Sequence, residues 1–524
     1  MVPSEYPRDG RSVNVARHHW CSPSTRRYGV VVVFPGRPST DWMRALADHY
    51  QAARSQSLSD ELCIVFDIDG TILDLRHLVA HVLLAYDRDR GADLFHGLVA
   101  GDIGVSENQI DALLESLEVP QGHRRDVASF YREHLWDEAA LIAASAPYRG
   151  VLGVIRWFQM QPGTSIALNT GRPEAKRQIT LDSLNAVGEA ARVRFEPELL
   201  FMRSDASAVP AAKSAALDEI VARGLRIVAV VDNEPENLAA MAGSHGGRDI
   251  LFLHADTIFE SQRSEGLGVV TGTAYELGGL ISEDRLREHV ELVWHGVNDA
   301  DNLRQFLDSG IRWAEIDLRR DPVGRLVLRH DGFDERPWDR DERSLPAVST
   351  VGALAAAGRS VKLDVKENGD TLRGVFDLVD ALELADERVW FNAEIDTVGP
   401  DGFEGFRSRH PGATASCPID FLVPLLMAAP EEADVVLRRL RSWGVTRLSV
   451  RWGRGVRRTI GELERRGWET NVYAVPDLES FLEAAILVPT SVTADFNFPA
   501  WRYFGRGSGQ HGVVHRYEPE AVPS

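Results

Sequence analysis

The first half of the chain alternates short apolar runs with longer stretches in which apolar residues recur at helical spacing. Glycine, proline or polar residues bound each run, a pattern typical of buried strands that are connected by helices. The expected strands cover residues 63–66, 165–170, 199–203, 226–231 and 249–253. The pattern therefore predicts an α/β domain built on a parallel sheet.

A long insertion separates the first two of these strands. It is mostly helical by period, with Leu78, Val82 and Tyr86 on one face. We expect this insertion, about residues 76–147, to form a helical cap over the carboxyl ends of the strands. A cap that closes over a site favours small substrates and excludes water during the reaction.

From about residue 290 the pattern changes to short strands that alternate regularly with helical stretches. This repeated alternation of strand and helix predicts a closed parallel barrel, with function expected at the carboxyl ends of the strands. The expected strands are residues 291–295, 313–317, 360–365, 389–394, 413–416, 446–450, 469–474 and 491–495, with an added strand at 326–329.

The remaining segments have weak periodicity. The apolar run Gly29–Phe34 is too short to span a bilayer, and we expect the N-terminal segment around it to be irregular. The predicted domains are an irregular segment 1–56, the sheet domain 57–262, a linker 263–288, the barrel 289–505 and a tail 506–524.

Composition sets outer limits on function. A formal net charge of −20 argues against nucleic acid as the main partner, because affinity for nucleic acid depends largely on phosphate neutralisation by Lys and Arg. Cys21, Cys63 and Cys417 are scattered and form no disulfide framework or zinc spacing. Without a signal peptide or a long apolar run, we expect no membrane insertion and a cytoplasmic protein.

The first expected strand runs directly into two carboxylates, Asp67 and Asp69. Side chains alternate along a strand, so both acids point the same way at its carboxyl end, while Gly70 and Thr71 turn the backbone away. One carboxylate can attack phosphorus and the other can transfer the proton, provided that a divalent cation holds the two negative groups together. The pair therefore predicts phosphoryl transfer.

The run Asp67-Ile68-Asp69-Gly70-Thr71 resembles the first motif of the haloacid dehalogenase superfamily, in its phosphatase branch. That resemblance implies an Mg²⁺-dependent phosphatase that forms an aspartyl-phosphate on Asp67. It also implies Thr170 as the holder of a phosphoryl oxygen, Lys213 as the charge-offsetting cation and Asp232 as a further metal ligand. By resemblance the catalytic residues are Asp67, Asp69, Thr170 and Lys213, the substrate-binding residues are Gly70, Thr71, Gly171 and Arg172, and the metal ligands are Asp67, Asp69 and Asp232.

The fourth of these motifs departs from the family pattern. Asn233 follows Asp232 where family members often carry a second acid, and Glu236 is the nearest substitute. We therefore expect the metal shell to be completed differently in this chain.

Acids and histidines gather at the ends of the expected barrel strands. Glu315, Asp317 and Asp364 would repel one another unless Mg²⁺ or Ca²⁺ lay among them, since oxygen-rich clusters select hard cations. His295 and His330 flank this group, so that one could accept a proton and the other could donate one. Stabilisation of a charged phosphoryl group would come from the metal and Lys366.

The barrel motifs resemble the glycerophosphodiester phosphodiesterase superfamily and, more closely, the menorin family. The first resemblance lies in the leading His, the Glu-x-Asp pair and a His-Asp dipeptide. The second adds a His-x-x-Asn start, which includes Asn298, and an Asn-Ala-acid run, which includes Asn392; the resemblance implies that both bind substrate. The matching runs are His295–Asn298, Glu315–Asp317, His330–Asp331, Lys362–Lys366 and Phe391–Glu394.

The combined prediction is a haloacid dehalogenase-like Rossmannoid parallel sheet with a helical cap, followed by a (β/α)8 TIM barrel. The predicted function is hydrolysis of a small phosphorylated metabolite by the capped domain, joined to a metal-dependent phosphodiesterase-like barrel. Two alternatives stay open. The barrel could bind a ligand or partner without turning it over, or the front half could be a phosphatase that trims nucleic acid ends, which Thr170–Glu174 and Met202-Arg203 also resemble.

Overall fold

The computed structural model describes most of the chain beyond residue 39. The N-terminal run Gly29–Phe34 and the predicted tail 506–524 lie outside the described residues. The described residues are 40–204, 207–257, 269–338, 344–453, 455–494, 496–497 and 502–503.

The first unit contains a six-stranded parallel sheet, as the alternating pattern predicted. Its spatial order is β3-β2-β1-β4-β5-β6, so the strand that carries the two acids lies in the middle, between β2 and β4. The strands are β1 (Leu62–Phe66), β2 (Thr164–Pro173), β3 (Leu200–Arg203), β4 (Arg226–Asp232), β5 (Leu251–Ala255) and β6 (Val270–Gly272).

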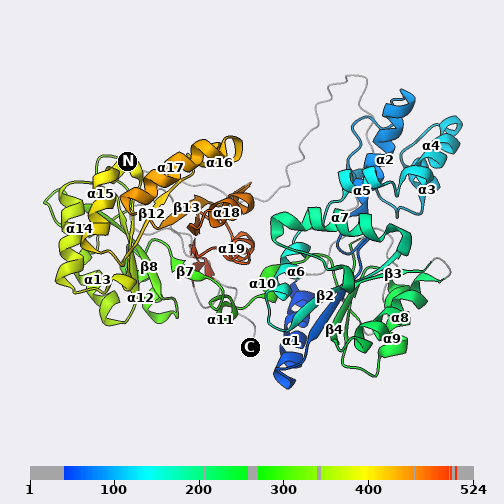
Figure 1. Ribbon diagram of the computed structural model, residues 1–524, viewed down its shortest axis with the longest axis horizontal. Coiled ribbons are helices and arrows are strands. Elements are labelled where there is room, and N and C mark those ends of the chain that lie inside the picture. The colour runs from blue at the N-terminus through cyan, green and yellow to red at the C-terminus, as the bar shows by residue number, and fades with distance from the viewer. Residues whose placement is uncertain are drawn as a thin grey trace, which may run out of the picture.

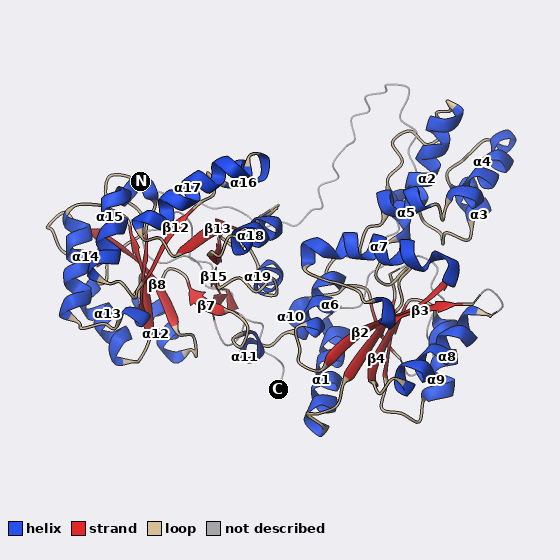
Figure 2. Cartoon of the chain, viewed as in Figure 1, coloured by secondary structure: helices blue, strands red, loops and turns tan. Residues whose placement is uncertain are grey.

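Helices connect and cover these strands (Figures 1 and 2). Strand β1 is buried along its whole length, because the sheet is covered on both sides and every residue from Leu62 to Phe66 packs into a core. The helices of this unit are α6 (Val151–Gln159), α7 (Arg177–Gly188), α8 (Val209–Ala222) and α9 (Pro235–His245).

The insertion between β1 and β2 is helical, which confirms the predicted helical segment. It forms its own apolar cluster, separate from the clusters of the sheet, and Ile179 of α7 joins that cluster from below. In Figure 1 these helices lie together at the upper right, above α7 and the sheet. They are α2 (Leu75–Arg90), α3 (Ile110–Ser116), α4 (Gln121–His134) and α5 (Glu138–Ala144).

Residues 40–56 correct the prediction of an irregular segment, because they form the long helix α1 (Thr40–Gln56). Trp42 and Leu46 are fully buried in the core of the sheet unit. The indole of Trp42 donates a hydrogen bond to the carbonyl of Ala274 at 2.6 Å. Local pattern does not reveal this helix, because its buried face packs on partners far along the chain, such as Ala274, which is 232 residues from Trp42.

Residues 269–286 likewise differ from the predicted linker. Strand β6 pairs with β5 as the sixth strand of the sheet, and the short helices α10 (Leu277–Leu280) and α11 (Glu283–Leu286) follow it. These elements are too short to give a periodic signal, so β6 depends on tertiary contacts, namely pairing with β5 and packing against Trp42 of α1.

The second unit is a closed barrel of eight parallel strands, which confirms the predicted barrel. Closure is made by the pairing of β15 with β7 and of β8 with β10, while β9 adds an antiparallel strand to β8. The strands are β7 (Glu291–Trp294), β8 (Trp313–Arg320), β9 (Leu326–Leu328), β10 (Ser360–Val365), β11 (Val389–Asn392), β12 (Thr414–Pro418), β13 (Arg447–Arg451), β14 (Glu469–Tyr473) and β15 (Ser491–Ala494).

Helices surround the barrel on its outside (Figure 1). A short antiparallel pair, β16 (Phe496–Asn497) with β17 (Arg502–Tyr503), follows the last barrel strand. The barrel helices are α12 (Ala300–Asp308), α13 (Ala347–Ala356), α14 (Asp370–Ala381), α15 (Ile395–Arg409), α16 (Val423–Ala428), α17 (Pro430–Trp443), α18 (Val456–Arg465) and α19 (Leu478–Ala485).

The two units contact each other through α10 and α19. The carboxylate of Glu479 accepts hydrogen bonds from the backbone N–H groups of Leu277 and Gly278, each at 2.8 Å. Arg192 pairs with Glu464 at 2.6 Å, and one apolar cluster extends through both units. Within the described part of the chain, no helix combines the length and the apolar character needed to cross a membrane.

Candidate active sites

A cavity of about 620 Å³ lies between the cap and the carboxyl ends of the sheet strands. Seven of the predicted residues of the first site meet here, although they come from the segment after β1, from β2 and from α8. Those lining the cavity are Asp67, Asp69, Gly70, Thr170, Gly171, Arg172 and Lys213. The parallel arrangement of β1, β2 and β4 explains this convergence, since the carboxyl ends of parallel strands share one edge.

Lys213 lies between two buried carboxylates at the floor of this cavity. Its Nζ is 2.8 Å from Asp67 Oδ1 and 2.6 Å from Asp232 Oδ2, and all three side chains are buried. Asp232 Oδ1 accepts further hydrogen bonds from the backbone N–H of Glu234 and from Asn237. The lysine thus holds Asp67 in place and offsets its charge, while its predicted role toward the transferring group stays a prediction.

The surroundings of Asp67 favour its neutral form in the free protein. Burial raises the pKa of Asp67 to about 8, with Asp232 and Asp69 adding to the rise and Lys213 opposing it. A further cation beside Asp67, in addition to Lys213, would lower this pKa and favour the ionised, nucleophilic carboxylate at neutral pH. Lys213 has its pKa raised, because its two carboxylate partners outweigh the cost of burial.

Oxygen atoms of the first motif converge on the side-chain amide of Asn233. The oxygen of this amide lies 2.9 Å from the carbonyl oxygen of Asp69 and 3.0 Å from Asp67 Oδ2, and Thr71 Oγ1 is 3.3 Å away. Turning the amide, so that its nitrogen faces these acceptors, satisfies them in the free protein. With the oxygen facing them, the separations match the spacing of about 3 Å between neighbouring ligands held about 2.1 Å from Mg²⁺.

These residues therefore fit a magnesium ion, with Asn233 in the place of an acid. Gly70 makes the arrangement possible, since its φ of 75° suits glycine and a Cβ atom there would lie 2.6 Å from Asn233. This ligand set differs from the predicted one, which consists of Asp67, Asp69 and Asp232. Asp69 offers its carbonyl oxygen rather than its carboxylate, and a metal role for Asp232, whose oxygens already have partners, stays a prediction.

Arg172 binds the carboxylate of Asp69 rather than an open phosphate position. Two parallel hydrogen bonds of 2.6 and 2.7 Å join the guanidinium to both carboxylate oxygens. A third bond reaches Thr180 Oγ1 at 3.2 Å, and the backbone N–H of Arg172 donates to Thr170 Oγ1. Arg172 therefore orients one of the two acids, and its predicted contact with substrate remains a prediction.

Sequence reasoning did not select several polar or aromatic residues that line the cavity, among them Glu107, Trp136, Lys176 and Glu234. Glu107 and Trp136 come from the cap, whereas Lys176 and Glu234 follow strands of the sheet. Burial raises the pKa of Glu234 to about 6, and the negative charges of Asp232 and Glu107 add to this rise. No motif could have revealed Glu107 or Trp136, because the cap sequence has no fixed spacing to the strands.

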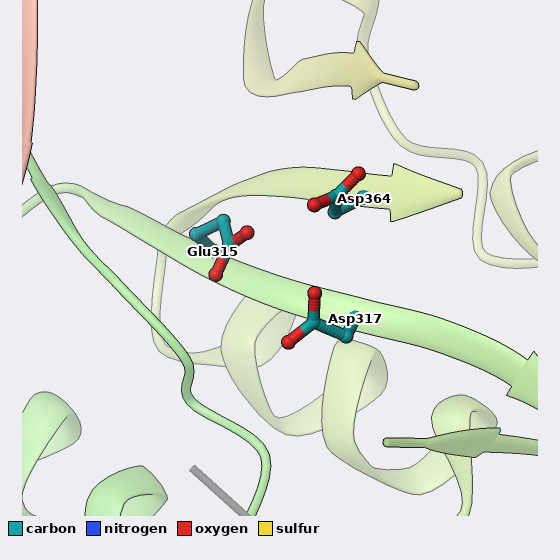
Figure 3. A group of neighbouring side chains, drawn as sticks. All are labelled: Glu315, Asp317 and Asp364. Atoms are coloured by element: carbon teal, nitrogen blue, oxygen red, sulfur yellow. The ribbon is translucent and has the colours of Figure 1, made fainter. Parts of the chain in front are cut away.

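The second site lies at the barrel, where three carboxylates face one another (Figure 3). Glu315 and Asp317 are two residues apart on β8, and Asp364 on β10 is the direct neighbour of Asp317 across the two strands. One oxygen from each of Glu315, Asp317 and Asp364 lies within 4.8 Å of the others. This confirms that the strand pattern brings the three predicted metal ligands together.

Lys366 and two asparagines hold these carboxylates in place. Lys366 Nζ lies 2.9 Å from Asp317 Oδ1 and 2.6 Å from Asp364 Oδ2. Asn298 binds Asp317 through its side-chain nitrogen at 2.5 Å, and its oxygen accepts the backbone N–H of Asp317 at 2.9 Å. Asn392 donates to Asp364 Oδ1 at 3.0 Å. The two asparagines predicted to bind substrate thus orient carboxylates in this structure.

The two predicted histidines lie beside the acids. His295 Nε2 is 3.8 Å from Glu315 Oε2, and Glu315 also accepts the backbone N–H of Gly296 at 2.7 Å. His330 Nδ1 is 2.9 Å from Asp331 Oδ1, a contact that orients the ring.

The acids of the barrel site differ sharply in their affinity for protons. Burial raises the pKa of Glu315 to about 7 and the charge of Asp317 adds to the rise, whereas His295 and Lys362 oppose it. For Asp317, Lys366 and the two histidines outweigh the cost of burial and hold its pKa well below the usual range. Lys362, which is buried beneath the acids on β10, was not among the predicted site residues; burial lowers its pKa.

The barrel acids fit a hard divalent cation. Asp317 Oδ1 is buried and, among the described residues, accepts no hydrogen bond of normal geometry, although Lys366 is close to it. Three carboxylates with one directly paired lysine leave negative charge that a cation such as Mg²⁺ or Ca²⁺ would balance.

Comparisons with known proteins give matches of low similarity. No protein-family model and no curated protein matches the sequence. A glycerophosphodiester phosphodiesterase from Parabacteroides distasonis is 16% identical over 40% of this chain and 94% of its own, with a TM-score of 0.31. An Oleispira antarctica phosphodiesterase, solved with sn-glycerol-3-phosphate, is 13% identical over 41% of this chain and 96% of its own, with a TM-score of 0.32.

A proposed phosphatase from Clostridium difficile is also similar. It is 13% identical over 43% of this chain and 100% of its own, with a TM-score of 0.30. Identities and TM-scores at this level do not assign an activity to this chain, so its function follows from the geometry of the two sites.

Proposed function

We propose that the capped unit is a haloacid dehalogenase-type phosphatase that hydrolyses small phosphomonoesters and uses Mg²⁺. One observation carries this proposal: the buried carboxylate of Asp67, paired with Lys213 at 2.8 Å, lies on the floor of a 620 Å³ cavity beside an oxygen cluster that fits Mg²⁺. A nucleophile, a cation for the transferring group and a second acid, Asp69, are present together.

The reaction follows from the positions of these side chains. Asp67 forms a bond to phosphorus while the bond to the alcohol oxygen breaks. Asp69 gives the leaving oxygen a proton, which it must first take up from solvent by releasing one of its hydrogen bonds from Arg172. Water then attacks phosphorus and returns a proton to Asp69, which releases phosphate and restores Asp67. Lys213 and the hydroxyl of Thr170 hold the charged group in both steps, and bound Mg²⁺ would supply further positive charge.

Activity of the full chain toward p-nitrophenyl phosphate tests this function. We expect hydrolysis with Mg²⁺, loss of activity with a chelator, and inhibition by beryllofluoride, which mimics a phosphoryl group on an aspartate. Mass spectrometry of enzyme quenched during turnover should show one added phosphoryl group on the peptide that contains Asp67. Metal-independent hydrolysis, or a phosphoryl group elsewhere, would contradict the proposal.

For the barrel we propose metal-dependent cleavage of a phosphodiester. This proposal rests on Glu315, Asp317 and Asp364, which fit a divalent cation, and on the two histidines that lie beside them. One histidine would accept the proton of the attacking hydroxyl and the other would protonate the leaving alcohol, while Lys366 and the bound cation stabilise the charged phosphoryl group. The product monoester is the kind of compound that the capped unit would accept.

Hydrolysis of bis(p-nitrophenyl) phosphate by the full chain separates this function from a barrel that only binds. His295→Ala and His330→Ala should each abolish diester cleavage and leave monoester hydrolysis intact. Metal binding without diester cleavage, with any of Mg²⁺, Ca²⁺ or Mn²⁺, would favour the binding alternative. A strong preference of the capped unit for a 3′-phosphorylated oligonucleotide over small monoesters would instead favour the nucleic-acid alternative.

A further inference from the structure

A tyrosine that follows the last strand of the sheet holds the backbone of the first motif. The hydroxyl of Tyr275 donates a hydrogen bond of 3.0 Å to the carbonyl oxygen of Thr71, and both residues are buried. The hydroxyl of Thr257 donates in the same way to the carbonyl of Gly70. The carbonyl of Asp69, a candidate ligand of Mg²⁺, belongs to the peptide group that immediately precedes these two. The two hydrogen bonds therefore fix the backbone beside a candidate metal ligand.

Close packing fixes Tyr275 itself. The centroid of its ring lies 4.9 Å from that of Trp42, whose indole donates to the neighbouring carbonyl of Ala274. The carbonyl oxygen of Tyr275 approaches Gly150 so closely that a Cβ atom there would lie only 1.9 Å away. Gly150 also has a φ of 84°, which suits glycine. The tyrosine therefore has little freedom to move away from the carbonyl that it binds.

The barrel anchors the segment that carries Tyr275. Helix α10 begins two residues later, and the backbone N–H groups of Leu277 and Gly278 donate to the carboxylate of Glu479 on α19. In Figure 1, α10 lies where the two units meet, and it contacts both α6 and α19. A continuous path of contacts thus leads from Glu479 of the barrel, through α10 and Tyr275, to Thr71 in the site of the capped unit.

We propose that Tyr275 is a positioning residue for the metal-binding backbone of the capped unit, and that the barrel holds Tyr275 in place through Glu479. This inference rests on the proposed phosphatase function, in which Mg²⁺ binds beside Asp67. Without the tyrosine hydroxyl, the buried carbonyl of Thr71 loses this hydrogen bond, and the backbone from Asp69 onward shifts to satisfy it elsewhere. Mg²⁺ then binds less tightly, whereas Asp67 keeps its own contact with Lys213.

The Mg²⁺ dependence of p-nitrophenyl phosphate hydrolysis tests the role of Tyr275. Tyr275→Phe removes only the hydroxyl. We expect it to raise the half-saturating Mg²⁺ concentration by about 10-fold, because loss of a group that orients a metal ligand typically weakens binding by about 10- to 100-fold. At saturating Mg²⁺, kcat should stay within about twofold of the wild type. Isothermal titration of Mg²⁺ into the same variant with Asp317→Asn, which weakens the barrel cluster, should show the loss of affinity without turnover.

Tyr50→Phe is the matched control for this substitution. Tyr50 is also a buried tyrosine of the sheet unit, and its hydroxyl lies 2.7 Å from Thr164 Oγ1. Thr164 is the first residue of β2, so this hydrogen bond lies at the amino end of the sheet, and neither residue lines the cavity of the capped unit. The control should therefore leave the half-saturating Mg²⁺ concentration unchanged.

A double-mutant cycle tests the contribution of the barrel. Glu479→Ala removes both hydrogen bonds to α10 and should raise the half-saturating Mg²⁺ concentration by about threefold. Added to Tyr275→Phe, it should raise this concentration little further, because Glu479 acts through Tyr275. Glu483→Ala is the control, since Glu483 lies on the same helix but pairs with Arg457 of the barrel at 2.6 Å. It should change neither the Mg²⁺ dependence nor diester cleavage.

Other outcomes would overturn the inference. An unchanged Mg²⁺ dependence in Tyr275→Phe would do so. A loss of kcat with unaltered Mg²⁺ affinity, in a variant that unfolds as cooperatively as the wild type, would show a general structural role instead. Full additivity in the double variant would overturn the part assigned to the barrel. If the wild type hydrolysed no monoester, the proposed phosphatase function would fail, and the Mg²⁺ titration would still decide whether Tyr275 positions the metal-binding backbone.

Discussion

The two acidic sites balance their charge in different ways. In the capped unit, each of the three motif aspartates has a cation of the protein beside it: Asp67 and Asp232 share Lys213, and Asp69 has Arg172. In the barrel, Lys366 contacts Asp317 and Asp364, while Glu315 has a histidine at 3.8 Å as its nearest described ion-pair partner.

This difference in charge balance predicts how each site depends on a bound metal ion. The first site is ordered by its own lysine and arginine, so a metal would act mainly on the charge of the reacting group. The second retains excess negative charge at its centre, so a metal would also stabilise the fold around it. The following predictions separate the two sites, beginning with the largest expected effect.

Asp67→Asn should abolish monoester hydrolysis and spare the barrel. We expect kcat on p-nitrophenyl phosphate to fall by at least about 10³-fold, because the amide cannot form the phosphoryl intermediate. Diester cleavage in the same preparation is the internal control and should stay within twofold. Loss of both activities together would show that the two sites are not independent.

Asp317→Asn should impair diester cleavage by the barrel and spare monoester hydrolysis by the capped unit. Removing one charge of the three-carboxylate cluster should weaken divalent metal binding by about 10- to 100-fold and diester cleavage by at least as much. Isothermal titration with Mg²⁺ or Ca²⁺ measures the first effect. The matched control is Asp308→Asn, on the exposed side of α12, which should change neither quantity. Unaltered metal affinity in Asp317→Asn would remove the barrel cluster as the metal site.

Glu315→Gln should stabilise the metal-free protein, and more so at higher pH. The pKa of Glu315 is raised to about 7 from an ordinary value of 4.5, so its contribution to stability is complete below about pH 4.5 and is lost as the pH rises to about 7. Glutamine does not titrate and escapes this loss, worth roughly 2–3 kcal/mol.

Urea unfolding in the presence of a chelator, at pH 5 and at pH 8, checks this prediction. The free energy of unfolding of Glu315→Gln should exceed that of the wild type at pH 8 and approach it at pH 5. With saturating metal the order should reverse, because the variant has lost a ligand. A variant less stable than the wild type at pH 8 without metal would show that the barrel carries no excess charge.

The smallest effect concerns the two buried cysteines, one in each unit. Cys63 lies on β1 and Cys417 on β12, and burial raises the pKa of each thiol to about 12. In a Cys21→Ser background, neither should react with a thiol reagent at pH 8 in the folded protein. Because one apolar cluster extends through both units, the two thiols should become reactive at the same urea concentration. Different midpoints would show that the units unfold separately.

Much of the fold could be predicted from local pattern. The strands around Asp67 and those of the barrel were recognisable because buried parallel strands are short apolar runs between polar turns. Helix α1 and strand β6 were not, because each gains its stability from distant partners: Trp42 packs in the core and reaches Ala274, and β6 pairs with the edge of β5. Local sequence carries little trace of such contacts.

The sequence by itself determined which side chains stand at the strand ends, since alternation along a strand places Asp67 with Asp69, and Glu315 with Asp317, on one side. Only the tertiary structure decided what those side chains do for one another. Arg172 binds Asp69, Asn233 lies beside the oxygens of the first motif, and Trp136 of the cap lies next to Arg172. The physical reason is that charge pairing depends on distances across separate elements, and these are set by packing rather than by spacing along the chain.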